Sequence, residues 1–321
     1  MIYKKIIVKT GHNNPLTEGV FFKQAGFEVA ERILGLGDRR EGSITAGCYD
    51  RMYWKYKLID YPSAWFQSST EYLALLWNLP GSPFHKSKRI GAWCRDAYVF
   101  AANNLNSDGS CLEAYPFERS FCATAFVLGH ICSGYLIISE PDVLRYLVEM
   151  GNFLKRNWGG YVSNQLAAAA LSEFRLARIA GEKDLYAAGH RKLEALYDNQ
   201  ASEGYFKEYG GLDIGYLSLT LSLLARLENE FPDTVDRDRI QKALAVLSER
   251  VADDGTYHYS SMSRGTQYLY PFGLAYWESP VLKRLEEGLR KGTVLRPSWL
   301  DDRYVTGLAI DYLYLVQWAG G

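Results

Sequence analysis

The chain has 321 residues, a length that suits either two average domains or one large repeat domain. It is 48% hydrophobic and 23% charged, an ordinary composition for a chain that buries a large core. Its formal net charge of -1 excludes the basic field that attracts nucleic acid or anionic lipid, and no apolar run is long enough to span a bilayer. We therefore expect neither nucleic acid nor a membrane span among its interactions.

Residues 1–60 lie outside the repeat that organises the rest of the chain, and we expect an irregular extension packed on the main domain. The opening segment MIYKKIIVKT has no long apolar stretch and no small-residue cleavage site, so we do not expect a signal peptide. The five cysteines show no CxxC spacing. These features predict free thiols in a cytoplasmic protein, without a metal site or a cofactor.

From residue 61 onward, two kinds of apolar run alternate. Runs rich in small and apolar residues are typical of buried inner helices, and runs with a single apolar stripe are typical of outer helices. The predicted inner helices cover 63–77, 120–137, 163–181, 215–231 and 298–318. The predicted outer helices cover 87–105, 141–158, 183–200 and 236–250.

Four glycine turns separate these runs. They contain Gly109, Gly160, Gly204 and Gly255, and their spacings of 51, 44 and 51 residues fit two helices and two connections. Glycine at such a turn supplies a positive φ. Hairpins of alternating inner and outer helices can close on themselves, and about five to six can be counted. We therefore predict an all-α fold, a one-domain α/α toroid, over residues 61–321.

The repeated DGS, EGY and DGT turns, each leading into a predicted inner helix, resemble the α/α-toroid superfamily over residues 60–318. That superfamily includes glycosidases, helical domains of polysaccharide lyases, glucuronyl C5-epimerases, and terpenoid cyclases and prenyltransferases. The segment over 202–227 looks most like the carbohydrate-active members. The sequence lacks the DxDD motif of cyclases that protonate their substrate. The resemblance therefore implies a carbohydrate-active enzyme ahead of an isoprenoid cyclase.

A toroid gathers the starts of its inner helices at one mouth, where ligands bind between the helices. The stretch DDGTYHYSSMSRGTQYLYPFG, over 253–273, combines tyrosines with arginine and glutamine, a mixture that suits a sugar ring. We expect substrate-binding side chains at such helix starts. They are Trp65, Arg119, Asn164, Gln165, Tyr216, Arg264, Gln267 and Tyr270.

Three chemistries fit a pocket wall of this aromatic and polar composition. A lyase or epimerase abstracts the C5 proton of a uronate, with Tyr268 or His258 as base and Arg264 as the cation that favours a phenolate. A glycosidase needs two carboxyl groups roughly 5–9.5 Å apart, and Glu118 and Asp213 are the candidates. An isoprenoid cyclase needs an aromatic cavity.

The structural alternative is that the two carboxylates cap helices and the tyrosines pack between them. His130, inside the run 120–137, is expected to be a hydrogen-bonded core histidine.

We expect one cavity to collect side chains from four segments. These are Glu118, Arg119, Asn164, Asp213, Arg264, Tyr268 and Tyr270. The preferred function is an enzyme acting on a polar glycan or glycan precursor, with lyase or epimerase chemistry, which requires a uronate, slightly ahead of hydrolysis. An isoprenoid cyclase-like enzyme and a non-catalytic glycan-binding or scaffold protein are the alternatives. A cluster of tyrosine, arginine and amide side chains would favour the lyase, and paired carboxylates would favour the hydrolase. A dry aromatic cavity would favour the cyclase, and a mouth blocked by side chains would favour the scaffold.

Overall fold

The computed structural model describes residues 20–320, and this part of the chain is helical. Its β-structure is confined to isolated bridges, such as the one between Cys111 and Ser120. The prediction of an all-α protein is therefore confirmed for these residues. Within them no helix is both long enough and apolar enough to cross a membrane.

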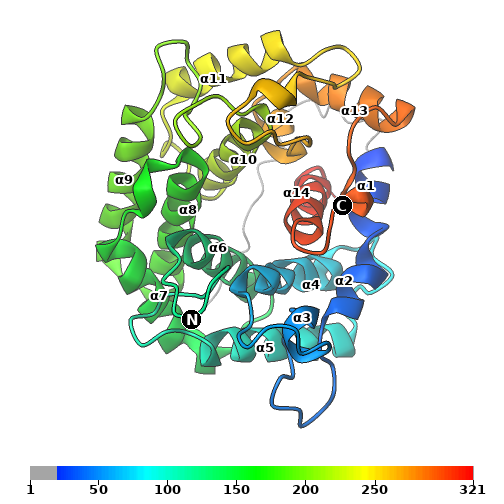
Figure 1. Ribbon diagram of the computed structural model, residues 1–321, viewed down its shortest axis with the longest axis vertical. Coiled ribbons are helices and arrows are strands. Elements are labelled where there is room, and N and C mark those ends of the chain that lie inside the picture. The colour runs from blue at the N-terminus through cyan, green and yellow to red at the C-terminus, as the bar shows by residue number, and fades with distance from the viewer. Residues whose placement is uncertain (1–19, 321) are drawn as a thin grey trace.

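An inner layer of helices surrounds the centre of the molecule (Figure 1). It consists of α4 (Ser69–Asn78), α6 (Phe121–Ile137), α8 (Ser163–Ala180), α10 (Ile214–Glu230), α12 (Pro271–Tyr276) and α14 (Val305–Trp318). Each of these helices packs on the next in this order, and α14 packs on α4. The contacts of the inner layer therefore make a closed circuit.

An outer helix backs each inner helix (Figure 1). The outer layer consists of α5 (Lys88–Asn103), α7 (Leu144–Arg156), α9 (Lys183–Asp198), α11 (Arg237–Arg250), α13 (Val281–Lys291) and α1 (Val20–Phe27). The two layers differ in burial as the sequence pattern predicts, since α8 is buried at every position from Ser163 to Ala177, whereas α9 buries one stripe. Small residues set the spacing between layers. A Cβ on Gly189 of α9 would lie 2.5 Å from Phe174 of α8.

The four glycine turns adopt the backbone conformation that the sequence predicts. Gly109, Gly160, Gly204 and Gly255 have φ values of 86°, 76°, 102° and 78°. At Gly109 a side chain is also excluded by space, because a Cβ there would lie 2.3 Å from the carbonyl oxygen of Glu149 on α7. Each turn thus reverses the chain between an outer helix and the next inner helix without a side-chain clash.

Residues 20–60 contain helices where irregular structure was expected. They are α1, α2 (Ala30–Leu36) and α3 (Arg51–Trp54), and α1 packs against α13 and α14. The expectations for residues 1–19 lie outside the described residues. Short 3-10 helices complete the fold, namely η1 (Ala64–Ser68), η2 (Pro141–Val143), η3 (Gly159–Tyr161), η4 (Tyr259–Ser261) and η5 (Pro297–Trp299). The last of these, with the turn that follows, delays the start of α14 to Val305, later than the predicted residue 298.

All five cysteines are free, and every one except Cys122 is fully buried. Burial raises the pKa of the Cys94 and Cys111 thiols to about 12, so both stay protonated at neutral pH. These thiols therefore act as small apolar core residues.

Candidate functional site

The segments that precede the inner helices meet at one end of the molecule. Backbone hydrogen bonds join neighbouring segments: Ala64 donates to Leu112 (2.9 Å), Ser163 to Lys207 (3.4 Å) and Ser263 to Leu212 (3.0 Å). An ion pair of 2.6 Å between Arg303 and Glu113 joins the segment before α14 to the segment before α6. These contacts gather side chains from distant parts of the sequence around a common opening.

A cavity of about 130 Å³ lies at this end, between the inner helices. At about 30 Å³ for each water molecule in the liquid, this volume corresponds to roughly four water molecules. Its wall is aromatic and charged, and its lining includes Trp65, Glu113, Phe126, His130, Asn164, Tyr209, Tyr216, Arg226, Arg264, Tyr268, Tyr270, Arg303, Tyr304 and Asp311.

Six of the predicted site residues line this cavity. They are Trp65, Asn164, Tyr216, Arg264, Tyr268 and Tyr270. The rings of Tyr268 and Tyr270 lie against each other with centroids 5.9 Å apart. The guanidinium of Arg264 lies 4.3 Å from the ring centroid of Tyr209. The structure thus brings tyrosines, an arginine and an amide to one wall.

The predicted catalytic carboxylates do not line the cavity. Glu118 accepts hydrogen bonds from three successive backbone N–H groups, the shortest from Ala114 at 2.7 Å. Asp213 is fully buried, caps α10 through the N–H of Tyr216 (2.9 Å) and also accepts from the N–H of Thr266 (3.1 Å). The expectation that both reach the cavity was wrong, because backbone donors occupy their oxygens. Asp213 caps a helix, as the structural alternative predicts, whereas Glu118 binds the N–H groups of a turn and caps no helix.

Four other predicted residues also stay outside the lining. Arg119 pairs with Asp108 at 3.4 Å and keeps 67% of its side chain exposed. Gln165 contacts the cavity wall from outside, because its amide donates to the hydroxyl of the lining residue Tyr209 (3.2 Å). His258 and Gln267 are exposed. Proximity in sequence to the tyrosines did not place these side chains in the cavity.

Tyr268 does not have the environment that a phenolate base requires. Burial raises the pKa of Tyr268 above its usual value, and the neighbouring Tyr216 and Tyr304 raise it further. Arg264 stacks on Tyr209 instead of lowering the pKa of Tyr268. The expectation of a phenolate favoured by Arg264 was therefore wrong, and Tyr268 is protonated at neutral pH.

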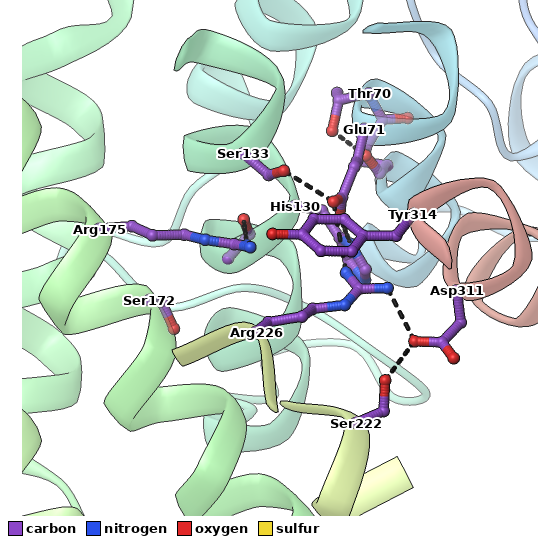
Figure 2. Close-up of polar contacts among 12 residues, drawn as sticks. Thr70, Glu71, His130, Ser133, Ser172, Arg175, Ser222, Arg226, Asp311 and Tyr314 are labelled. Atoms are coloured by element: carbon purple, nitrogen blue, oxygen red, sulfur yellow. Dashed lines mark hydrogen bonds and ion pairs between the residues drawn. The ribbon is translucent and has the colours of Figure 1, made fainter. Parts of the chain in front are cut away.

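A buried ionic network forms the floor of the cavity (Figure 2). Its centre is Glu71 of α4, which accepts hydrogen bonds from His130 Nδ1 (2.6 Å) and Ser133 Oγ (2.7 Å) on α6. Arg226 of α10 lies 3.3 Å from Glu71 Oε1, the oxygen that also accepts from Ser133, and 2.9 Å from Asp311 of α14. Four inner helices thus contribute one linked set of polar side chains.

Further contacts hold the side chains of Arg226 and Asp311 in place. The guanidinium of Arg226 stacks on the ring of Tyr314, with Cζ 4.3 Å from the ring centroid. Asp311 accepts from the hydroxyl of Ser222 and from the N–H of Phe272 (2.9 Å). Burial raises the pKa of Glu71, but the charge of Arg226 and the hydrogen bond from His130 outweigh it and hold that pKa at about 2. Glu71 is therefore ionised at neutral pH.

A second pair closes the centre beside this floor. Arg175 of α8 pairs with Glu230 of α10 at 2.6 Å and donates to the carbonyl of Gly129 (2.9 Å). The hydroxyl of Tyr314 donates to Glu230 (2.9 Å). Figure 2 shows Arg175 and Arg226 extending between the helices from different elements. Charged side chains therefore fill the centre where the inner helices converge.

His130 is hydrogen-bonded as predicted, but it also lines the cavity. Its side chain is 13% exposed, and its Nδ1 lies 2.6 Å from Glu71 Oε2. With its proton on Nδ1, the neutral ring leaves the lone pair of Nε2 for a ligand, and Glu71 stabilises the charged ring once Nε2 is protonated. This is the arrangement of an oriented acid–base group.

Sequence reasoning missed Glu71, Arg226 and Asp311. Each lies inside a helix that is apolar on nearly all sides. A charge at such a position must find a partner when it is buried. Isolated charges inside the predicted inner helices were therefore the signal that could have located the floor.

The cavity carboxylates are both paired with arginines. Glu113 pairs with Arg303, and Asp311 pairs with Arg226. By contrast, no carboxylate within residues 20–320 forms an ion pair with Arg264, although this guanidinium reaches the wall. The free cation can receive an anionic group from a ligand.

Within the described residues, no cluster of histidine, cysteine, aspartate or glutamate has the geometry to hold a metal ion. No protein-family model matches the chain, and no curated protein matches it.

Proposed function

We propose that the chain is an α/α toroid and a carbohydrate-active enzyme that removes the C5 proton of a uronate in a polar glycan, by lyase or epimerase chemistry. The alternation of inner and outer helices and the contact between α14 and α4 support the toroid. The cavity at the start of the inner helices supports the location of the active site.

The observation that carries the reaction is an oriented histidine in the same cavity as an unpaired arginine. His130 accepts the C5 proton at Nε2, and ionised Glu71 stabilises the resulting imidazolium. Arg264 binds the uronate carboxylate and neutralises charge that develops on it as the proton leaves. In a lyase the C5 electron pair then forms the C4–C5 double bond, the C4–O bond breaks, and the departing oxygen takes the proton from the imidazolium. In an epimerase C5 instead takes a proton from water on the opposite face, and the imidazolium returns its proton to solvent. His130 thus takes the role that the sequence suggested for Tyr268.

The tyrosines have a different part in this proposal. Burial raises the pKa of Tyr216, Tyr268 and Tyr270 above the ordinary value, so their hydroxyls stay protonated. A protonated hydroxyl donates a hydrogen bond to a sugar oxygen, and the ring presents an apolar face to the C–H side of the sugar. Asn164 adds an amide at the same wall.

The ion pairs of the wall argue against the two other enzyme classes. A glycosidase needs one carboxyl group that holds a proton, whereas Glu113 and Asp311 each lie against an arginine. A carbocation needs a dry aromatic cavity, whereas the charged side chains of Glu113, Arg264 and Arg303 also line this one. Proton abstraction from a uronate uses the charges that are present.

The test incubates the protein with a panel of uronate-containing polysaccharides. A lyase product is read from the ultraviolet absorbance of the unsaturated uronate, and epimerisation from uptake of solvent deuterium at C5. His130→Gln should lower turnover by about a hundredfold or more, because it removes the base. The control is His85→Gln, since His85 is exposed on the turn between α4 and α5 and does not line the cavity.

The outcomes separate the candidates. New reducing ends without unsaturation or exchange would assign hydrolysis. Equal turnover in His130→Gln and wild type would remove His130 from the mechanism. Binding without any turnover would leave a glycan-binding protein, and no binding to any member of the panel would end the proposal.

A further inference from the structure

Exposed aromatic residues mark the segments that lead into three consecutive inner helices. Phe117 before α6 is 94% exposed, Tyr161 before α8 is 62% exposed, and Tyr209 before α10 is 50% exposed. All three have a positive φ, of 63°, 60° and 52°. We call these three residues the aromatic rim.

The rim is unfavourable for the folded state. A side chain with Cβ is disfavoured in the left-handed region, which glycine occupies freely. Phe117 is almost fully exposed, so little apolar burial offsets its backbone strain. Residues held in such conformations cluster at ligand sites. The rim therefore points to an apolar contact that the folded chain alone does not supply.

The rim is continuous with the cavity. Tyr209 belongs to both, because it lines the cavity and is half exposed. The side-chain amide of Asn199 donates to the carbonyl of Tyr161 (2.8 Å) and to the carbonyl of Lys207 (3.2 Å), which ties the second rim segment to the third. Phe117 follows the cavity residue Glu113 on the same segment. An elongated ligand can pass from the cavity onto these rings.

The opposite direction is closed. Below the cavity the paired side chains of Arg226 and Glu71 lie across the centre, and Arg175 lies beside them (Figure 2). Arg175 is paired there with Glu230 at 2.6 Å. A polymer cannot thread past buried ion pairs without leaving charges unpaired, which is costly. The cavity therefore admits a ligand from the rim side only.

We infer that the ligand is the end of a chain: its terminal unit occupies the cavity and the following units stack on Tyr209, Tyr161 and Phe117. This inference rests on the proposed function and specifies its substrate as an oligosaccharide or polysaccharide end. The aromatic faces match the C–H faces of sugar rings, and the phenol hydroxyls of the two tyrosines match sugar hydroxyls.

The test measures kcat/KM for uronate oligosaccharides of increasing length. In the wild type it should rise with each added unit until the rim is filled. In the double variant Phe117→Gly and Tyr161→Gly it should fall by roughly tenfold for long substrates, since two stacking contacts are lost, and stay unchanged for the shortest substrate. Glycine suits the positive φ at both positions, so the variant folds.

The control is Ile44→Ala, because Ile44 is 99% exposed on a segment that packs near the outer helix α5 through Gly47. It should match the wild type at every length. With polymeric substrate, short products should appear from the start while viscosity falls slowly, as attack at ends requires.

Each outcome has one meaning. The chain-end inference is overturned if the wild-type kcat/KM does not depend on substrate length, or if the rim variant keeps the wild-type length dependence. Either result leaves the proposed function standing. Early collapse of polymer viscosity also overturns it. Loss of vesicle binding or of self-association in the rim variant, with glycan kinetics unchanged, would assign the rim to a lipid surface or a second copy. No turnover or binding of any glycan overturns both proposals.

Discussion

Two buried glutamates on the inner helices differ in the hydrogen bonds and ion pairs that their carboxylates make. Glu71 on α4 and Glu173 on α8 are both fully buried. The oxygens of Glu71 meet His130, Ser133 and Arg226 at the cavity floor. Within residues 20–320, the oxygens of Glu173 have no hydrogen-bond partner. The same residue type at the same burial is thus fully partnered in one region and unpartnered in the other.

The partners decide the charge. Burial raises the pKa of both groups, but at Glu71 the guanidinium of Arg226 prevails and the pKa is about 2. At Glu173 burial prevails over the charges of Lys192, Arg191 and Lys155, and the pKa rises to about 8. Lys192 does not bond to Glu173, because its ammonium donates to the carbonyls that end α7. The fold therefore keeps one buried carboxylate charged where the cavity needs it and the other neutral.

Removal of the cation at the floor should have the largest effect. Arg226→Met keeps most of the side-chain volume but leaves Glu71 and Asp311 without their shared partner. Breaking a buried pair in this way costs about 3–5 kcal/mol, a large part of the 5–15 kcal/mol that stabilises a typical domain. Urea denaturation at neutral pH measures the free energy of unfolding.

The matched control is Arg290→Met, which removes an arginine that pairs with Glu287 on the surface of α13. Exposed pairs of this kind contribute little to stability, so this variant should unfold at nearly the wild-type urea concentration. Adding Glu71→Gln to Arg226→Met should recover stability, since one uncompensated charge disappears. A double variant no more stable than the single one would contradict the ionic account of the floor.

Glu173 should produce the second largest effect, and its sign depends on pH. The folded pKa of about 8 lies above the unfolded value near 4.5, so the folded state binds the extra proton between these values. Stability should therefore fall as pH rises from about 5 to about 8. Glu173→Met removes the buried carboxyl and should be more stable than wild type by more than about 1 kcal/mol near pH 8.

Glu194→Gln is the control, because Glu194 is exposed on α9 and should leave the wild-type pH profile intact. Thermal denaturation across the pH range gives both profiles. If wild type and Glu173→Met lose stability in parallel as pH rises, Glu173 is not the group that titrates.

The helices were predictable because their patterns are local. The predicted run 163–181 corresponds to α8 over Ser163–Ala180, and the run 215–231 corresponds to α10 over Ile214–Glu230. The short α12 was missed, since Pro271–Tyr276 is too brief to show a period. The helices of residues 20–60 were missed as well, and α1 completes the outer layer by packing on α14, which is distant in sequence.

The site was predictable only in part. The tyrosine-rich stretch before α12 does supply Arg264, Tyr268 and Tyr270 to the cavity. Glu118 and Asp213 were misplaced because sequence position cannot show that nearby N–H groups already occupy their oxygens. The floor depends on contacts between residues as far apart as Glu71 and Arg226, so local patterns could not assemble it.

Glu208 gives the smallest expected effect and the sharpest test of what keeps a buried carboxylate charged. It is fully buried before α10 and lies within hydrogen-bond distance of Asn164 Nδ2 (2.6 Å) and Thr220 Oγ1 (3.0 Å), but no cation pairs with it within residues 20–320. Burial raises the pKa of Glu208 to about 8 despite these hydrogen bonds. Hydrogen bonds without an opposite charge are therefore expected to leave it neutral.

The variant Glu208→Gln resembles that neutral form, with the amide oxygen of Asn164 turned toward the glutamine. It should change the free energy of unfolding by less than about 1 kcal/mol near pH 6, the size of one hydrogen bond. It should also be more stable than wild type above pH 8, where wild-type Glu208 ionises. Glu203→Gln, on the exposed turn before it, should leave the profile unchanged. A loss of about 2 kcal/mol or more near pH 6 would mean that Glu208 is already ionised there. Hydrogen bonds alone would then suffice to hold a buried carboxylate charged, and the contrast between Glu71 and Glu173 would be one of hydrogen bonding instead of ion pairing.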